Sequence, residues 1–139
     1  MQGDQLLDFA TRYTAAWCSQ NAASVAAFYS VDGSLSVNGG TSATGRPAIT
    51  EVAQSFMTAF PDMQVKLDKV RVEGERPEYH WTLIGTNTGP GGTGHRVRIS
   101  GFESWQFGDD GLILSSLGQF DQTEYRRQLR QGVSPASPV

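Results

Sequence analysis

The spacing of apolar residues divides the chain into a helical first part and a stranded second part. An apolar stripe with a period of about 3.6 residues runs through residues 4–19, which predicts an amphipathic helix. Asn21 offers an N-cap for a short second helix that carries Phe28 and Tyr29. Residues 45–60 predict a third helix, with a proline near its start.

Strict alternation of apolar and polar residues replaces the helical period elsewhere. A short strand is expected at residues 34–37, between the second and third helices. Four further alternating segments, separated by Gly, Pro and Asp turns, lie at residues 63–73, 78–87, 96–107 and 112–120. A short polar helix follows at residues 124–131. We therefore predict an α+β fold in which one curved antiparallel sheet surrounds an apolar pocket.

Composition supports one folded domain. The chain has 139 residues, of which 38% are apolar and 18% charged, and it carries seven Phe, four Tyr and three Trp. That much apolar and aromatic surface is typical of a globular domain rather than a disordered chain. We assign residues 1–133 to a single domain and residues 134–139 to a disordered tail.

Charge and the rare reactive residues exclude several classes of function. The net charge is -3, and no broad basic face indicates nucleic acid. No apolar run is long enough for a membrane span or a signal peptide, so we expect a cytoplasmic protein. Cys18 has no partner for a disulfide, and His80 and His95 do not show metal-ligand spacing. We expect neither a metal nor a cofactor.

Two carboxylates are candidates for acid/base chemistry. Alternation in residues 96–107 places Glu103 on a face that is otherwise apolar, and alternation in the last strand places Gln119 and Asp121 at the end of a mostly apolar row. A carboxyl group in an apolar cavity loses hydration, which raises its pKa toward the range of a general acid or base. The alternatives are structural: Asp121 could cap the following helix, and Glu103 could pair with an arginine on a neighbouring strand.

Aromatic residues are the candidates for the pocket wall. Tyr13 and Trp17 lie one helical turn apart, so their rings could orient a planar ligand. The histidine His80 alternates with Tyr79 and Trp81, and we interpret it as a surface or interface residue. The aromatic residues assigned to the pocket are Tyr13, Trp17, Phe56, Phe60, Trp81 and Trp105.

Three segments of the sequence resemble the SnoaL-like branch of the nuclear-transport-factor-2-like superfamily, as does the order of the predicted elements. The segments are FPDMQV at residues 60–65, GTNTG at residues 85–89 and DGLILSSLGQFDQTEYRRQL at residues 110–129. The resemblance implies a cone-shaped sheet that, with three helices from the N-terminal half, encloses an apolar pocket.

The resemblance also implies roles for individual residues. SnoaL-like polyketide cyclases carry a catalytic aspartate on the last strand, which matches Asp121, and a preceding tryptophan that is Leu117 here. The histidine of the family's GTHTG motif is Asn87, and the strand that carries a second pocket histidine has Glu103 and Ser104. Asn87, Leu117 and Gln119 complete the expected substrate-binding set.

These observations favour a cofactor-independent acid/base enzyme of cyclase or isomerase type that acts on a small hydrophobic molecule. Asp121 would move the proton, and Gln119, Asn87 or a protonated Glu103 would hold the developing oxyanion. One alternative is a non-catalytic module for ligand binding or dimeric interaction. Another is an epoxide hydrolase of the limonene type, which the same superfamily contains and which works through an Asp, Arg, Asp constellation.

A homodimer is the expected assembly. Phe102 lies on the strand face opposite the apolar row of residues 96–107, and residues 79–84 are apolar on both faces. The outer face of the sheet would then expose more apolar surface than a solvated face usually does, and a second copy of the chain would cover it.

Overall fold

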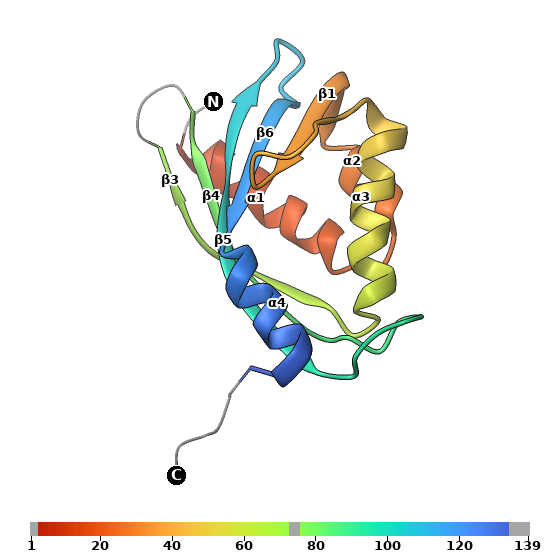
Figure 1. Ribbon diagram of the computed structural model, residues 1–139. Helices are drawn as coiled ribbons and strands as arrows, with labels where there is room; N and C mark the ends of the chain where they lie inside the picture. The colour runs from red at the N-terminus through yellow and green to blue at the C-terminus, as the bar shows by residue number, and fades with distance from the viewer. Residues whose placement is uncertain (1–2, 73–75, 134–139) are drawn as a thin grey trace.

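A computed structural model describes residues 3–72 and 76–133, and it has the predicted α+β architecture (Figure 1). Its helices are α1 (Gly3–Trp17), α2 (Ala22–Ala26), α3 (Arg46–Ala59) and α4 (Gln122–Gln131). Its strands are β1 (Tyr29–Val37), β2 (Ala43–Thr44), β3 (Gln64–Arg71), β4 (Glu78–Thr86), β5 (Arg96–Phe107) and β6 (Ile113–Phe120). The tail predicted at residues 134–139 lies outside the described residues. No helix in the described ranges is long and apolar enough to cross a membrane.

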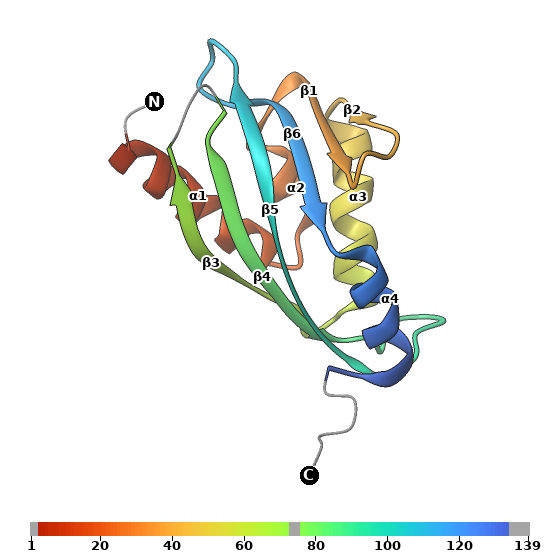
Figure 2. The ribbon, with the colours of Figure 1, turned by 60° about the vertical axis from the view of Figure 1, so that its left-hand side comes forward.

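The helices α1, α2 and α3 lie together on one face of a curved sheet (Figure 2). Their apolar stripes face the sheet, because residues three or four positions apart share one side of a helix. In α1 this stripe runs from Leu6 to Trp17, and in α3 it runs through Ile49, Ala53 and Met57. The hydrophobic core therefore lies between this helical layer and the concave face of the sheet.

The second helix is shorter than the sequence predicts. It ends at Ala26, and Tyr29 begins β1 instead of continuing the helix. The carbonyl of Phe28 accepts a hydrogen bond from Ile113 N at 2.9 Å, and Tyr29 pairs with Ile113 in β6. Pairing with a distant strand thus overrides the local helical spacing.

The six strands form one sheet in the order β2-β1-β6-β5-β4-β3. The strands from β3 to β6 form the predicted antiparallel meander. The first strand is the exception, because β1 joins β6 in parallel, with Leu35 opposite Ser116. A parallel pair needs a long connection, and here α3 and the meander supply it.

A β-bulge in β6 decides which of its side chains face the helices. Gln106 pairs with Ser115, but the next residue, Phe107, pairs with Ile113, so Leu114 is the extra residue. One extra residue reverses the alternation beyond it. Ser116 is fully buried, whereas Leu117 is exposed. The observed inner row is therefore Ile113, Ser116, Gly118 and Phe120, which differs from the predicted row of Ile113, Ser115, Leu117, Gln119 and Asp121.

The last helix covers the part of β5 that extends beyond the end of β6 (Figure 1). Arg98 N donates a hydrogen bond to Gln128 Oε1 at 2.7 Å, which satisfies a backbone group at this free edge. The ring of Tyr125 packs edge to face against Phe120, with centroids 5.4 Å apart, and lies 6.4 Å from Phe60. Tyr125 thereby closes one end of the space between helices and sheet.

Candidate functional site

A small apolar cavity lies between the helical layer and the concave face of the sheet. Its volume is about 70 Å³, which is about half of the roughly 150 Å³ of an engineered apolar cavity that binds benzene. A ligand larger than a few atoms therefore requires the lining to move outward. The lining residues are Trp17, Leu35, Val37, Val52, Phe56, Val65, Tyr79, Trp81, Leu83, Ile99, Glu103, Gly118, Phe120 and Tyr125.

Glu103 is the one carboxyl group among the residues that line this cavity. It lies on the inner face of β5, between Tyr79 of β4 and Gly118 of β6, and is 7% exposed. A Cβ at Gly118 would lie 3.9 Å from Glu103 Cγ. The missing side chain of Gly118 thus leaves open space beside the carboxyl group.

The two oxygens of Glu103 have different surroundings. Oε1 accepts hydrogen bonds from Ser116 Oγ at 2.7 Å, Trp105 Nε1 at 2.8 Å and the Tyr13 hydroxyl at 3.0 Å. The Tyr29 hydroxyl lies 3.5 Å from Oε1 and 2.8 Å from the Tyr13 hydroxyl. Within the described residues, Oε2 has only a longer contact of 3.2 Å with the same Tyr13 hydroxyl. The network therefore anchors Oε1 and leaves Oε2 the freer oxygen.

Burial dominates the electrostatics of this cluster. Removal from water raises the pKa of Glu103 above its usual 4.5, and the hydrogen bonds from Trp105, Ser116 and the tyrosines oppose this rise. Burial also raises the pKa of Tyr13 and of Tyr29 well above 10.0, and the nearby charge of Glu103 adds to the effect. The two tyrosines thus remain protonated donors, while Glu103 is an acid of this cluster whose pKa lies above its usual range.

Aromatic rings form most of the surroundings of this cluster. Tyr79 stacks on Trp105 with ring centroids 4.9 Å apart, and its hydroxyl is hydrogen-bonded to the Thr14 hydroxyl at 2.6 Å. Trp17 packs edge to face against Phe56, with centroids 6.2 Å apart. These contacts leave Glu103 in an environment of low polarity, where electrostatic interactions are strong.

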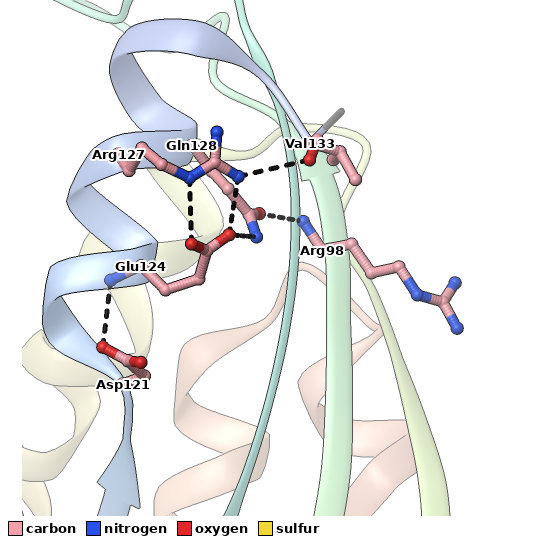
Figure 3. A network of polar contacts seen from close by, with 6 residues as sticks. All are labelled: Arg98, Asp121, Glu124, Arg127, Gln128 and Val133. Atoms are coloured by element: carbon pink, nitrogen blue, oxygen red, sulfur yellow. Dashed lines mark hydrogen bonds and ion pairs between the residues drawn. The ribbon is translucent and has the colours of Figure 1, made fainter. Parts of the chain in front are cut away.

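Asp121, the other predicted acid/base residue, lies outside the cavity lining. It is the N-cap of α4, where its Oδ1 accepts a hydrogen bond from Glu124 N at 3.0 Å (Figure 3). Glu124 in turn pairs with Arg127 at 2.7 Å and accepts from Gln128 Nε2 at 2.6 Å. Asp121 therefore caps the following helix, as the structural alternative in the sequence analysis proposed. The structure does not bring Asp121 and Glu103 together.

The remaining predicted residues fall into three groups. Trp17, Phe56 and Trp81 line the cavity. Tyr13, Phe60 and Trp105 are fully buried in the core, and Tyr13 and Trp105 donate to Glu103. The third group is absent from the lining: Leu117 and Gln119 are exposed, and Asn87 holds the glycine-rich loop, because its Oδ1 accepts from Thr93 N at 2.8 Å.

Several residues of the site were not predicted from the sequence, and four of them contact Glu103 or shape the cavity beside it or at its end. Tyr29 and Ser116 bind Glu103, and Gly118 and Tyr125 line the cavity. Ser116 and Gly118 would have required knowledge of the bulge in β6. The predicted alternative for Glu103, a pair with an arginine on a neighbouring strand, is replaced by bonds from neutral donors.

The histidine singled out in the sequence lies on the outer face of the sheet. His80 Nε2 is 3.0 Å from Glu78 Oε1, and its ring stacks on Phe102 with centroids 5.3 Å apart. Among the described residues, no group of three or more His, Cys, Asp and Glu is arranged to hold a metal ion.

Solved structures with the same fold cover nearly the whole chain. A protein from Catenulispora acidiphila with a ketosteroid isomerase-like fold, crystallised with trimethylamine, has a TM-score of 0.76 at 16% identity over 87% of this chain and 91% of its own. A candidate SnoaL-like polyketide cyclase from Jannaschia sp. CCS1 has a TM-score of 0.71 at 13% identity over 91% of this chain and 94% of its own.

A third similar structure is the epoxide hydrolase/cyclase-like enzyme SalBIII of pyran ring formation in salinomycin. Its TM-score is 0.73 at 18% identity, and the match covers 88% of this chain and 96% of that one. Identities this low show a shared fold alone. No protein with curated annotation matches the chain with significant sequence similarity. Residues 10–116 match the SnoaL-like domain, and the chain therefore belongs to the SnoaL-like domain family.

Proposed function

We propose that this protein is a cofactor-independent acid/base enzyme that moves a proton on a small hydrophobic carbonyl compound, with Glu103 as the catalytic residue. The observation that carries the proposal is one buried carboxyl group in an apolar cavity, anchored mainly through Oε1. Sites that perturb the pKa of a carboxyl group in a cavity are frequently catalytic. The similar structures include a candidate polyketide cyclase, which is consistent with carbonyl chemistry.

The proposed reaction begins with the transfer of a proton from the carbon beside a carbonyl group to Glu103 Oε2. The electron pair of that C–H bond forms the enolate, and its negative charge moves to the carbonyl oxygen. In an isomerisation of an unsaturated ketone, Glu103 returns the proton at another carbon of the dienolate. In a cyclisation the enolate carbon attacks a second carbonyl, and the oxygen of that carbonyl takes the proton from Glu103. Trp105 and Ser116 hold Oε1, so the carboxyl group keeps one orientation through both steps.

Deuterium exchange tests the first step without knowledge of the natural substrate. Small cyclic ketones are incubated with the protein in deuterium oxide, and incorporation at the carbon beside the carbonyl is followed by NMR. We expect the wild type to accelerate exchange and Glu103→Gln to lose at least about 100-fold of that acceleration, because general acid/base catalysis contributes roughly 100- to 10,000-fold. Glutamine keeps an acceptor for Trp105 and Ser116 but cannot take the proton.

Asp121→Asn is the matched control, because it removes a carboxylate outside the cavity and asparagine caps helices as well as aspartate does. It should retain the wild-type exchange rate. Loss of exchange in Asp121→Asn with retention in Glu103→Gln would assign the chemistry to Asp121 and overturn the proposal.

The second candidate function is a non-catalytic ligand-binding module. The single carboxyl group of the cavity lining favours it, because the described lining residues supply no second acid/base partner for Glu103. Ketones that bind without any exchange above the buffer rate would support this function. An epoxide hydrolase receives less support, since the residues that line the cavity include no arginine and only one carboxylate.

A further inference from the structure

Two of the three tryptophans leave their indole N–H groups without a partner. Trp17 Nε1 and Trp81 Nε1 are buried and make no hydrogen bond within the described residues, whereas Trp105 Nε1 donates to Glu103. A buried donor without an acceptor destabilises the folded protein, and native proteins leave few of them. Both unpartnered indoles belong to residues that line the apolar cavity.

Neither of these N–H groups is hydrogen-bonded to a described side chain that lines the cavity. Among its lining side chains, Glu103 is engaged by donors deeper in the core, and the Tyr79 hydroxyl is hydrogen-bonded to Thr14. The other lining side chains are apolar, apart from the Tyr125 hydroxyl on α4. Trp17 lies on the side of the Glu103 network, because its ring packs edge to face against Tyr13 with centroids 6.3 Å apart. Its indole opposes the rise in the pKa of the Tyr13 hydroxyl, although the two groups are outside the geometry of a hydrogen bond.

The fold holds the two indoles in place from opposite layers. Trp17 ends α1, in the helical layer, and Trp81 lies on β4, directly opposite Gly101 of β5. A Cβ at Gly101 would approach Trp81 Cζ2 to 2.7 Å, so only glycine leaves room for this ring position. Phe120 packs edge to face on the same ring, with centroids 6.0 Å apart. The Trp81 indole is therefore seated by packing rather than by a hydrogen bond.

We propose that Trp17 and Trp81 donate hydrogen bonds to oxygen atoms of the bound ligand. The cavity would then select neutral, mostly apolar molecules that carry a carbonyl or ether oxygen over hydrocarbons of the same shape. The described residues that line the cavity include no lysine or arginine to bind an anion. This assignment deepens the proposed function by naming the ligand chemistry at the same cavity, but it requires binding alone and not turnover.

Spectra of the indole N–H groups test the assignment directly. Cyclopentanone and cyclopentane are matched small probes that differ in one carbonyl oxygen, and both require the same outward movement of the lining. Addition of cyclopentanone to nitrogen-15-labelled protein should move the Trp17 and Trp81 indole proton resonances downfield. Cyclopentane should leave them much less changed, and the Trp105 resonance, already hydrogen-bonded to Glu103, serves as the internal reference.

Affinities of variants supply the second measurement. Trp17→Phe and Trp81→Phe should each weaken cyclopentanone binding about 5-fold, which is the effect of one lost hydrogen bond. Each variant should change cyclopentane binding less than about 2-fold, because cyclopentane accepts no hydrogen bond. Phe56→Leu changes the lining without removing a donor, so it should affect both probes equally.

The same resonance shifts should persist in Glu103→Gln, even if that variant and the wild type show no deuterium exchange. Cyclopentanone that binds without moving either indole resonance, or equal losses for both probes in both tryptophan variants, would overturn the proposal.

Discussion

Glu103 shows how one polar residue can be tolerated in an apolar cavity. Its burial would be costly without partners, because an unpaired carboxylate loses its hydration. Ser116, Trp105 and Tyr13 replace that water with three hydrogen bonds to Oε1 of 3.0 Å or less. All of these donors are neutral groups, so the charge is stabilised without being cancelled, and the pKa of Glu103 stays raised.

The raised pKa of Glu103 predicts a pH dependence of stability. In the unfolded chain the group ionises near its usual pKa of 4.5, and in the folded protein it ionises at higher pH. Its contribution to the free energy of unfolding is therefore fully present below about pH 4.5 and is lost as the pH rises through the folded pKa. The loss amounts to at most about 1.4 kcal/mol per pH unit in that window.

Urea unfolding followed by tryptophan fluorescence, from about pH 4 to about pH 8, measures this effect as the difference between wild type and Glu103→Gln. Asp62, Asp110 and Glu124 have lowered pKa values, so their contribution is lost as the pH falls, but both proteins share them. We expect the stability of the wild type relative to the variant to decline with rising pH. Parallel curves across the range would refute a raised pKa for Glu103.

At the scale of elements, the bulge in β6 and the start of α4 separate the two predicted carboxylates. The bulge at Leu114 turns Ser116 and Gly118 toward Glu103 and turns Leu117 and Gln119 outward. Asp121 then follows the end of the strand, where its side chain caps α4 (Figure 3). The same helix carries Tyr125 to the cavity, so Asp121 supports the site through the helix that it caps.

Removal of the Asp121 side chain should destabilise the protein without changing the rate of proton transfer in the cavity. We expect Asp121→Ala to lower the free energy of unfolding by about 1 kcal/mol, the usual cost of losing an N-cap side chain. Amide hydrogen exchange should accelerate in the first turn of α4, while deuterium exchange into ketones should stay within about 2-fold of wild type. An unchanged stability would show that the bond to Glu124 N contributes nothing in solution.

At the scale of the whole molecule, α1, α2 and α3 cover one face of the sheet, and no described helix covers the middle of the other face (Figure 2). On the opposite face, Phe102 stacks on His80 and pairs with Gln119, and Leu117 on the same strand as Gln119 is 42% exposed. We propose that a second copy of the chain covers this patch of Phe102, His80 and Leu117 in a two-fold homodimer. A self-complementary contact is the commonest way for a soluble protein to bury such a patch.

Sedimentation at micromolar concentration tests the dimer. The wild type should sediment with twice the monomer mass of 15.1 kDa, and Phe102→Asp should shift the protein toward the monomer, because a dimer would bury an unpaired charge. Leu7→Asp is the matched control, since Leu7 is 51% exposed on α1, on the helical side of the molecule. A wild type that sediments as a monomer would rule out the proposed dimer at that concentration.

Local patterns were sufficient for much of the fold. The apolar stripes of α1 and α3 and the alternation in β3, β4 and β5 follow from neighbouring residues, because the period of a helix or strand is a local property. Glu103 was found in the same way, since β5 keeps its alternation from Val97 to Trp105 without interruption. The local periods of α1, α3 and β4 also placed three aromatic residues in the cavity wall, which are Trp17, Phe56 and Trp81.

The rest of the site depended on contacts between residues far apart in the chain. The parallel pairing of β1 with β6 ended α2 early and brought Tyr29 to Glu103, and the bulge in β6 reversed the face of every later residue in that strand. Neither leaves a periodic signal, because a bulge and a pairing partner are chosen by the energy of the assembled sheet. The sequence by itself therefore determined the elements and one buried acid, and tertiary structure decided which residues surround that acid.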